Sequence, residues 1–144
     1  MNTYTYDPQT ELDDLGVPVH YLPLRDMLAA WDAERRKVYC TQGLGPIQKR
    51  CALTHELAHI ALGHHRCTYG GATNVATLAQ ERAAELWAAR RLITVVQLAI
   101  AYDSDLPKSV LARELGVTPR IFRARILAEE EDEQRWLSPR ETFH

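Results

Sequence analysis

The sequence has no long apolar run and little net charge. Its longest apolar stretch covers residues 92–102 and is interrupted by Thr94 and Gln97, so it is too short to span a membrane. The first 14 residues are polar and acidic, which predicts no secretory signal peptide. The formal net charge of −2 gives the molecule no basic field of the kind that non-specific nucleic-acid binders use.

Cysteine is also scarce. Only Cys40, Cys51 and Cys67 occur, an odd number without the spacing of a disulfide scaffold, and this fits a reducing cytoplasm. The 144 residues are 46% hydrophobic, which suits one compact domain or a domain with a small helical appendix. We therefore expect a soluble intracellular protein with no membrane association.

An H-E-x-x-H motif lies in residues 53–64, within an apolar pattern of helical period. His55 and His59 are four residues apart, so on a helix both imidazoles share one face and can reach one zinc ion. Glu56 then lies beside the metal without binding it, where it can take a proton from the metal-bound water. A surface helix that happens to carry these residues is the alternative, and the apolar surroundings argue against it.

A third zinc ligand is expected because a catalytic zinc usually has three protein ligands and one open position. Glu81 and Glu85 are four residues apart in a second predicted helix and so share a face. One carboxylate can bind zinc while the other accepts the second ring N–H of a ligand histidine. The alternative is an ordinary exposed glutamate pair near Arg82 and Arg90.

The periodicity of the chain predicts an α+β fold, mostly helical, with a short antiparallel sheet. The first 14 residues read as a loose lead-in with one helical turn, and the acidic run at 129–133 reads as a solvated helix end. The expected strands are an edge strand over 17–24 and a hairpin formed by 27–31 and 37–41. The expected helices are a metal-binding helix over 47–63, a second long helix over 75–102 after a glycine-bearing loop at 67–74, and two short helices at 110–115 and 119–129.

Two segments, T-H-E-L-A-H-I-A-L-G-H-H and Q-E-R-A-A-E-L-W-A-A-R-R-L-I, together resemble the ImmA/IrrE family of zinc metallopeptidases, and more narrowly forms found in actinobacterial phages and prophages. The resemblance covers about residues 17–127. It implies a minimal zincin-like peptidase that cleaves or controls a phage or mobile-element repressor in the cytoplasm of a bacterial host cell.

The same resemblance implies the identity of the zinc ligands. They would be His55, His59 and a glutamate from the family pattern E-x-x-A-(N/D), which favours Glu81. Position 85 departs from that pattern, because Glu85 stands where the family usually has Asn or Asp. Glu85 could therefore itself reach the metal or hold a ligand histidine.

The oxyanion formed during peptide hydrolysis would need a donor besides zinc. The sequence does not choose among His64, His65, Tyr69 and Tyr102. We expect His64 and His65 to be helix-end residues rather than metal ligands, since no partner Cys or His pair follows them at zinc-finger spacing.

Residues 110–126 resemble a helix-turn-helix, with Gly116 at the turn. Its second helix offers Arg120, Arg123 and Arg125, which could contact phosphates, bases or a partner protein. This supports a rival function: a DNA- or repressor-binding regulatory module with a non-catalytic or vestigial metal site. The acidic segment that follows argues against DNA binding.

The sequence therefore predicts a zinc-dependent metallopeptidase, with the zincin-like core over residues 1–103. Residues 104–144 would form a helix-turn-helix-like appendix and acidic tail packed on that core. A repressor-type protein is the expected substrate, and nucleic acid is not favoured. A third hypothesis is a phage-encoded interaction protein that sequesters a host factor without proteolysis.

Overall fold

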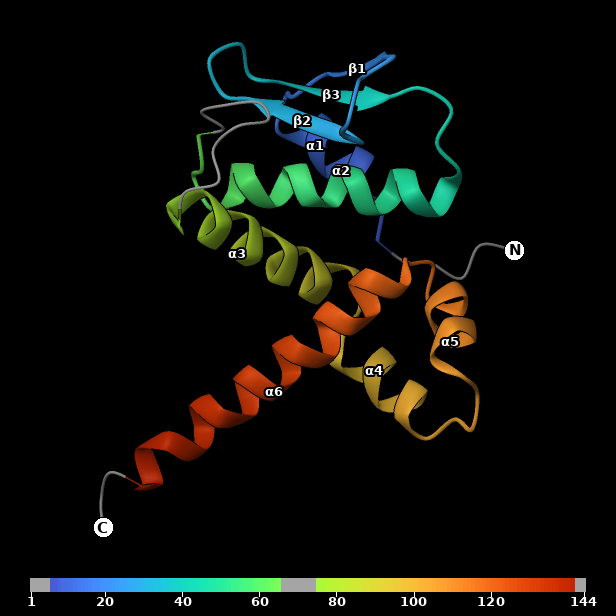
Figure 1. The fold of residues 1–144 in the computed structure, drawn as a ribbon, viewed down its shortest axis with the longest axis vertical. Coiled ribbons are helices and arrows are strands. Elements are labelled where there is room, and N and C mark those ends of the chain that lie inside the picture. Colours follow the sequence, from blue (N-terminus) through green and yellow to red (C-terminus); the bar gives the residue numbers. More distant parts are fainter. Residues whose placement is uncertain (1–5, 66–74, 142–144) are drawn as a thin grey trace.

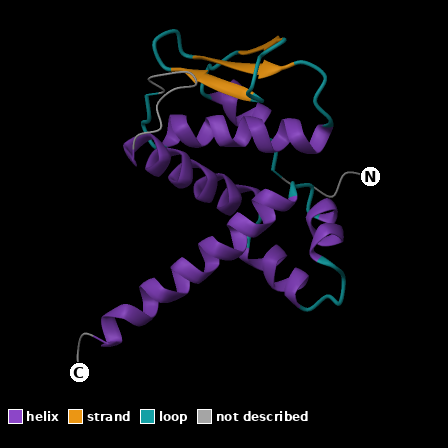
Figure 2. Cartoon of the chain, in the orientation of Figure 1, coloured by secondary structure: helices purple, strands orange, loops and turns teal. Residues whose placement is uncertain are grey.

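The chain folds into six helices and a three-stranded sheet within the part that the structure describes, and the predicted α+β class is confirmed (Figures 1 and 2). The structure is a computed structural model, and it describes residues 6–65 and 75–141. The elements in order are α1 (Pro8–Asp14), β1 (Val19–Leu22), β2 (Ala29–Asp32), β3 (Lys37–Thr41), α2 (Pro46–Ala61), α3 (Val75–Leu92), α4 (Val95–Tyr102), α5 (Lys108–Glu114) and α6 (Pro119–Glu141).

The sheet has the order β1-β3-β2 and lies over α2 (Figure 1). β2 and β3 form the predicted antiparallel hairpin, with Trp31 opposite Val38. β1 is the predicted edge strand, but it pairs in parallel with β3, with Val19 opposite Val38. The prediction of a purely antiparallel sheet is therefore wrong. β1 and β2 do run in opposite directions, and β3 inserts between them, which makes the sheet mixed.

Helix α2 separates two hydrophobic clusters and is covered on more than one face (Figure 1). Leu53 and Leu57 pack towards the sheet, in a cluster that includes Trp31 and Val38. Cys51 belongs to the second cluster, which α3, α4, α5 and α6 complete. Because both clusters anchor α2, side chains on its remaining face are held at fixed positions.

The predicted helix over residues 75–102 is in fact two helices, and that prediction is corrected. α3 ends at Leu92, and Thr94 caps the start of α4. The Gln97 N–H donates to Thr94 Oγ1 at 3.1 Å, and the Thr94 N–H donates to Gln97 Oε1 at 2.9 Å. This capping box begins a new helix although apolar residues lie on both sides of Thr94.

Helix α6 is much longer than the predicted 119–129, because it continues through the acidic run to Glu141. That run is not only a solvated helix end. Arg82 of α3 lies 3.2 Å from Glu131, and Arg90 lies 3.0 Å from Asp132. These ion pairs join α6 to α3, and beyond them α6 projects away from the rest of the chain (Figure 1).

The N-terminal lead-in contains α1, which is more regular than the single predicted turn. Asp7 caps it by accepting the Gln9 N–H at 3.0 Å. Leu12 of this helix is buried in the hydrophobic cluster that contains Trp31 and Val38 of the sheet. The predicted loop at 67–74 lies outside the described residues. The division of the chain into 1–103 and 104–144 stays a prediction.

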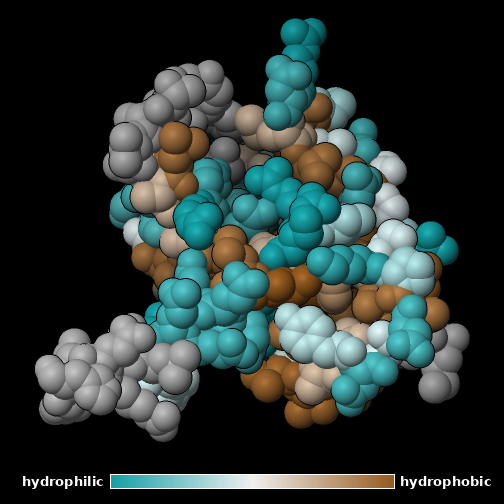
Figure 3. Space-filling model, turned by 60° about the horizontal axis from the view of Figure 1, so that its bottom comes forward, coloured by the Kyte–Doolittle hydropathy of each residue, from teal (hydrophilic) through white to brown (hydrophobic). Residues whose placement is uncertain are grey.

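The surface of the described residues mixes polar and apolar areas (Figure 3). The brown patches in this view interrupt the teal polar surface. Exposed apolar side chains include Val95, Val96 and Ile100 of α4. No helix in the described ranges is both long enough and apolar enough to cross a membrane.

Candidate metal centre

Helix α2 positions the H-E-x-x-H motif, as the sequence predicts. It begins with Pro46, whose missing N–H costs nothing at the first helical position. Three motif residues follow near its C-terminal end. The His59 and Glu56 side chains are buried, whereas His55 is partly exposed towards a cleft. The packing of α2 thus leaves an accessible imidazole above a buried one.

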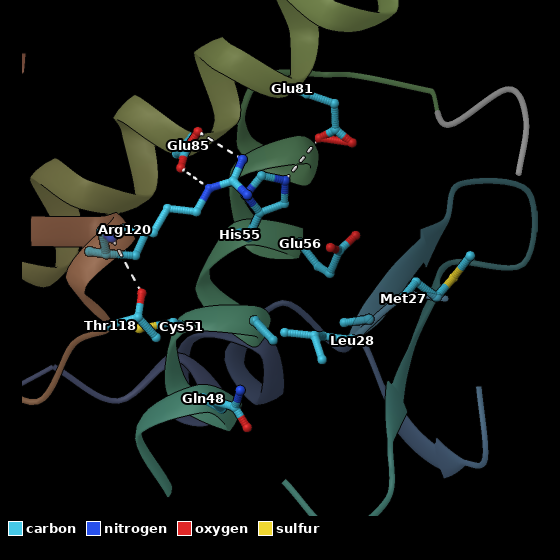
Figure 4. Close-up of a pocket in the computed structure, with 13 residues that line it drawn as sticks. Met27, Leu28, Gln48, Cys51, His55, Glu56, Glu81, Glu85, Thr118 and Arg120 are labelled. Atoms are coloured by element: carbon cyan, nitrogen blue, oxygen red, sulfur yellow. Dashed lines mark hydrogen bonds and ion pairs between the residues drawn. The ribbon is translucent and has the colours of Figure 1, made fainter. Parts of the chain in front are cut away.

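Three side chains from two helices, His55, His59 and Glu81, converge at the motif. Figure 4 shows two of them, His55 and Glu81, on either side of their contact. Glu81 of α3 places Oε2 2.9 Å from His55 Nε2 and 3.0 Å from His59 Nε2. One candidate ligand atom from each residue lies within 4.8 Å of the other two. Two imidazole nitrogens and one carboxylate oxygen are a donor set of catalytic zinc sites, so the residues fit a metal ion.

The electrostatics of the group follow from these contacts. The hydrogen bonds from His55 and then from His59 hold the pKa of the Glu81 carboxyl well below its usual range. Burial lowers the pKa of His55, but the hydrogen bond to Glu81 and the charges of Glu56, Glu81 and Glu85 together raise that pKa overall. Glu81 is therefore an anion at neutral pH, as a metal-binding carboxylate must be.

Glu56 lies in the same cleft but outside the three-residue ligand group. Its side chain is only 3% exposed and points to the Met27 and Leu28 side of the cleft (Figure 4). The structure therefore places Glu56 next to the candidate ligands rather than among them. Its predicted catalytic role stays a prediction.

Glu85 lines the cleft with a different partner. Arg120, at the start of α6, donates from Nε to Glu85 Oε1 at 2.6 Å (Figure 4). The structure thus brings Glu81, and not Glu85, into the group with the histidines. The prediction that Glu85 holds a ligand histidine stays a prediction.

The cleft has a volume of about 480 Å³ and opens between the sheet, α2, α3 and α6. Met27, Leu28 and Ala29 form its wall on the sheet side, and Thr118 and Ile121 contribute to the wall on the α6 side. Sequence reasoning missed these residues, because only the fold brings them to the motif. Most of the surface inside the cleft is apolar.

The candidate oxyanion donors named from the sequence have different locations. Tyr102 lies on α4, outside the residues that line the cleft, and Tyr69 lies outside the described residues. His64 follows the end of α2, and its Nδ1 lies 3.1 Å from His59 Nδ1. Desolvation, followed by the nearby His59, lowers the pKa of His64. His65 is exposed.

The arginines of the helix-turn-helix resemblance have three different environments. Arg125 is only 2% exposed and donates from Nε to the Ile93 carbonyl at 2.7 Å, so its predicted contact with DNA or a partner is wrong. Arg120 is exposed but paired with Glu85, and Arg123 is exposed. In addition, Arg50 of α2 donates to the Gly116 carbonyl at 2.8 Å, which ties the turn to the helix that carries the H-E-x-x-H motif. These contacts weaken the DNA-binding hypothesis.

The fold and the group of His55, His59 and Glu81 are compatible with the zincin-like class of metallopeptidases. The chain belongs to the ImmA/IrrE family, because residues 12–127 match the family described as the IrrE N-terminal-like domain. A search of curated proteins finds none that matches this chain. Membership of a peptidase family implies a protein substrate. The matched range includes α2 and α3, which carry the candidate ligands, as well as α5 and the first part of α6.

Proposed function

We propose that the protein is a zinc-dependent endopeptidase. The observation that carries the proposal is the convergence of His55, His59 and Glu81 at an open cleft that His55, Glu56 and Glu81 line. A bound zinc ion would supply Lewis acidity, lowering the pKa of a water molecule and polarising the scissile carbonyl. His55 and His59 would hold it through Nε2, and Glu81 through Oε2, because these atoms already point at one another.

Glu56 is the proposed general base. Glu56 lines the cleft together with His55 and Glu81. Its carboxylate can therefore take a proton from the attacking water and pass it to the leaving amine. The Glu56 side chain is buried, which restricts its motion, and a fixed base is already oriented when the substrate arrives.

The shape of the cleft supports an extended peptide as substrate. β2 is an edge strand of the sheet, and the residues that lead into it, Met27 and Leu28, line the cleft. An extended peptide can pair with such an edge through main-chain hydrogen bonds, while the apolar wall receives its side chains. The proposed substrate is a repressor-type regulator of a phage or mobile element, acting in the bacterial cytoplasm. The resemblance to the family supports this choice.

The test compares the zinc-loaded wild type with Glu56→Gln and His59→Ala. Each is incubated with a peptide library made from a bacterial proteome, and new peptide ends are identified by mass spectrometry. We expect specific cleavage by the wild type, a loss of about 100- to 10,000-fold in Glu56→Gln with zinc retained, and loss of both metal and cleavage in His59→Ala.

Two outcomes would contradict the proposal. Cleavage by Glu56→Gln at the wild-type rate would remove Glu56 as the base. A partner that is bound in stoichiometric amounts by the wild type but yields no product would favour sequestration over proteolysis. Salt-sensitive retention of duplex DNA would revive the rival module, and its absence at low salt would remove it.

A further inference from the structure

The end of helix α2 brings the chain back over one of the motif histidines. Gly63 has a φ of +70°, a left-handed conformation that glycine adopts without strain. The His64 N–H donates to the His59 carbonyl at 2.9 Å, and the Gly63 N–H donates to the Ile60 carbonyl at 3.2 Å. This pair of bonds is a Schellman motif, in which the second residue after the cap contacts the third residue before it. Here those two residues are His64 and His59.

The side chains of these two residues also meet. His59 Nδ1 lies 3.1 Å from His64 Nδ1, and the ring centroids are 5.3 Å apart. On the opposite side of the same ring, His59 Nε2 lies 3.0 Å from Glu81 Oε2. Both nitrogens of this imidazole, which is 2% exposed, therefore have defined partners.

The contact fixes which nitrogen of each ring carries a proton when a metal is held. A histidine that binds a metal through Nε2 is neutral and carries its proton on Nδ1. His59 Nδ1–H must then donate to His64 Nδ1, since that is the atom it faces. His64 is the acceptor and carries its own proton on Nε2. It lies behind the ligand ring, on the side away from Glu81, and so it supports a ligand rather than acting as one.

We infer that His64 is a positioning residue for the metal centre, which accepts the His59 Nδ1–H and holds that imidazole in its ligand orientation. The inference rests on the proposed zinc site. It deepens that site because it assigns the histidine that follows the H-E-x-x-H helix, and it makes Gly63 the residue whose backbone brings the two rings together.

The test measures zinc affinity by competition with a chelator, for the wild type and three variants. His64→Leu and His64→Asn have nearly the same shape, but only the asparagine offers an oxygen that can accept the His59 proton. We expect zinc affinity to fall about 10- to 100-fold in His64→Leu, as is usual when the outer partner of a ligand histidine is lost. His64→Asn should recover most of that loss, and the exposed neighbour His65→Ala should bind zinc like the wild type.

A second readout does not depend on affinity. Long-range nitrogen–proton NMR spectra of the zinc-loaded wild type should show His64 as the Nε2–H tautomer and His59 protonated at Nδ1. Equal zinc affinity in His64→Leu and the wild type, or a His64 protonated at Nδ1, would overturn the inference while leaving the proposed zinc site standing. A wild type that takes up no zinc would overturn both.

Discussion

At the scale of single residues, Glu81 joins two helices through one oxygen atom. Its Oε2 lies within 3.0 Å of both His55 and His59, so α2 and α3 share a charged contact at the mouth of the cleft. Glu85, one helical turn further along α3, has a separate partner in Arg120. Glu81 and Glu85 lie one turn apart on the same helix but have different partners. Substituting one or the other should therefore have different effects.

We predict that Glu81→Gln loses bound zinc and that Glu85→Gln retains it. The neutral amide of the first variant is a weak ligand for a divalent cation, whereas the second changes only the ion pair with Arg120. Metal content after dialysis should be about one zinc per chain in the wild type and in Glu85→Gln, and close to zero in Glu81→Gln. The reverse result would make Glu85 the third ligand.

Residue chemistry shows how far the site could be predicted. The spacing of His55, Glu56 and His59 places them correctly, because four residues make about one helical turn. Spacing alone could not choose between the two glutamates. In the structure Glu81 meets the histidines, whereas Glu85 pairs with Arg120, a residue distant in the sequence that lies at the start of a helix packed against α3. The resemblance to the family favoured Glu81, and the structure brings Glu81 to the histidines.

At the scale of elements, the sequence predictions fail mainly where α3, α4 and α6 meet. Apolar residues continue on both sides of Thr94, so the pattern predicted one helix where the capping box makes two. The same junction buries Arg125, which looked like a surface arginine of a recognition helix. Its guanidinium instead binds the Ile93 carbonyl at the end of α3, a tertiary contact that no local pattern records.

Replacing Arg125 with Met should destabilise the fold. The variant keeps an unbranched apolar stem but removes the donor from a buried carbonyl and the partner from Glu129. We expect the free energy of unfolding to fall by about 2 kcal/mol, in line with the loss of a hydrogen bond from a charged group. Denaturant unfolding of the metal-free protein would measure it. The exposed control, Arg123→Met, should change stability by less than about 0.5 kcal/mol. Equal effects in the two variants would mean that the buried contact contributes nothing specific.

At the scale of the whole molecule, the candidate metal centre connects the two hydrophobic clusters. α2 packs against the sheet on one side and the helical cluster on the other, and Glu81 reaches it from α3. A metal held by both helices stabilises every part of the fold that unfolds with them, because the unfolded chain offers no preformed site. Zinc should therefore raise the melting temperature of the whole chain.

The size of that increase should depend on pH in a direction set by His55. Folding raises the pKa of His55 above 6.5, so the stability that this group gives the metal-free protein is fully present below 6.5 and is lost as pH rises through the folded pKa. Glu81, whose pKa is lowered, stays ionised and contributes stability that is lost only as pH falls below about 4.5. Of these two groups, it is therefore His55 that matters between pH 6 and 8. The lowered pKa of His64 acts in the opposite direction there, since it favours the neutral ring in the folded protein.

Zinc competes with the same proton, since it binds only the neutral imidazole. Below the folded pKa of His55, the free energy of zinc binding should weaken by about 1.4 kcal/mol for each pH unit. We predict that zinc, held at one free concentration by a metal buffer, raises the melting temperature more at pH 8 than at pH 6. Scanning calorimetry of the metal-free and zinc-loaded protein measures the difference at each pH. The Glu81→Gln variant should show little increase at either pH. A zinc-dependent increase in wild type that is as large at pH 6 as at pH 8 would mean that His55 is already neutral, and that the charge of Glu81 does not raise its pKa.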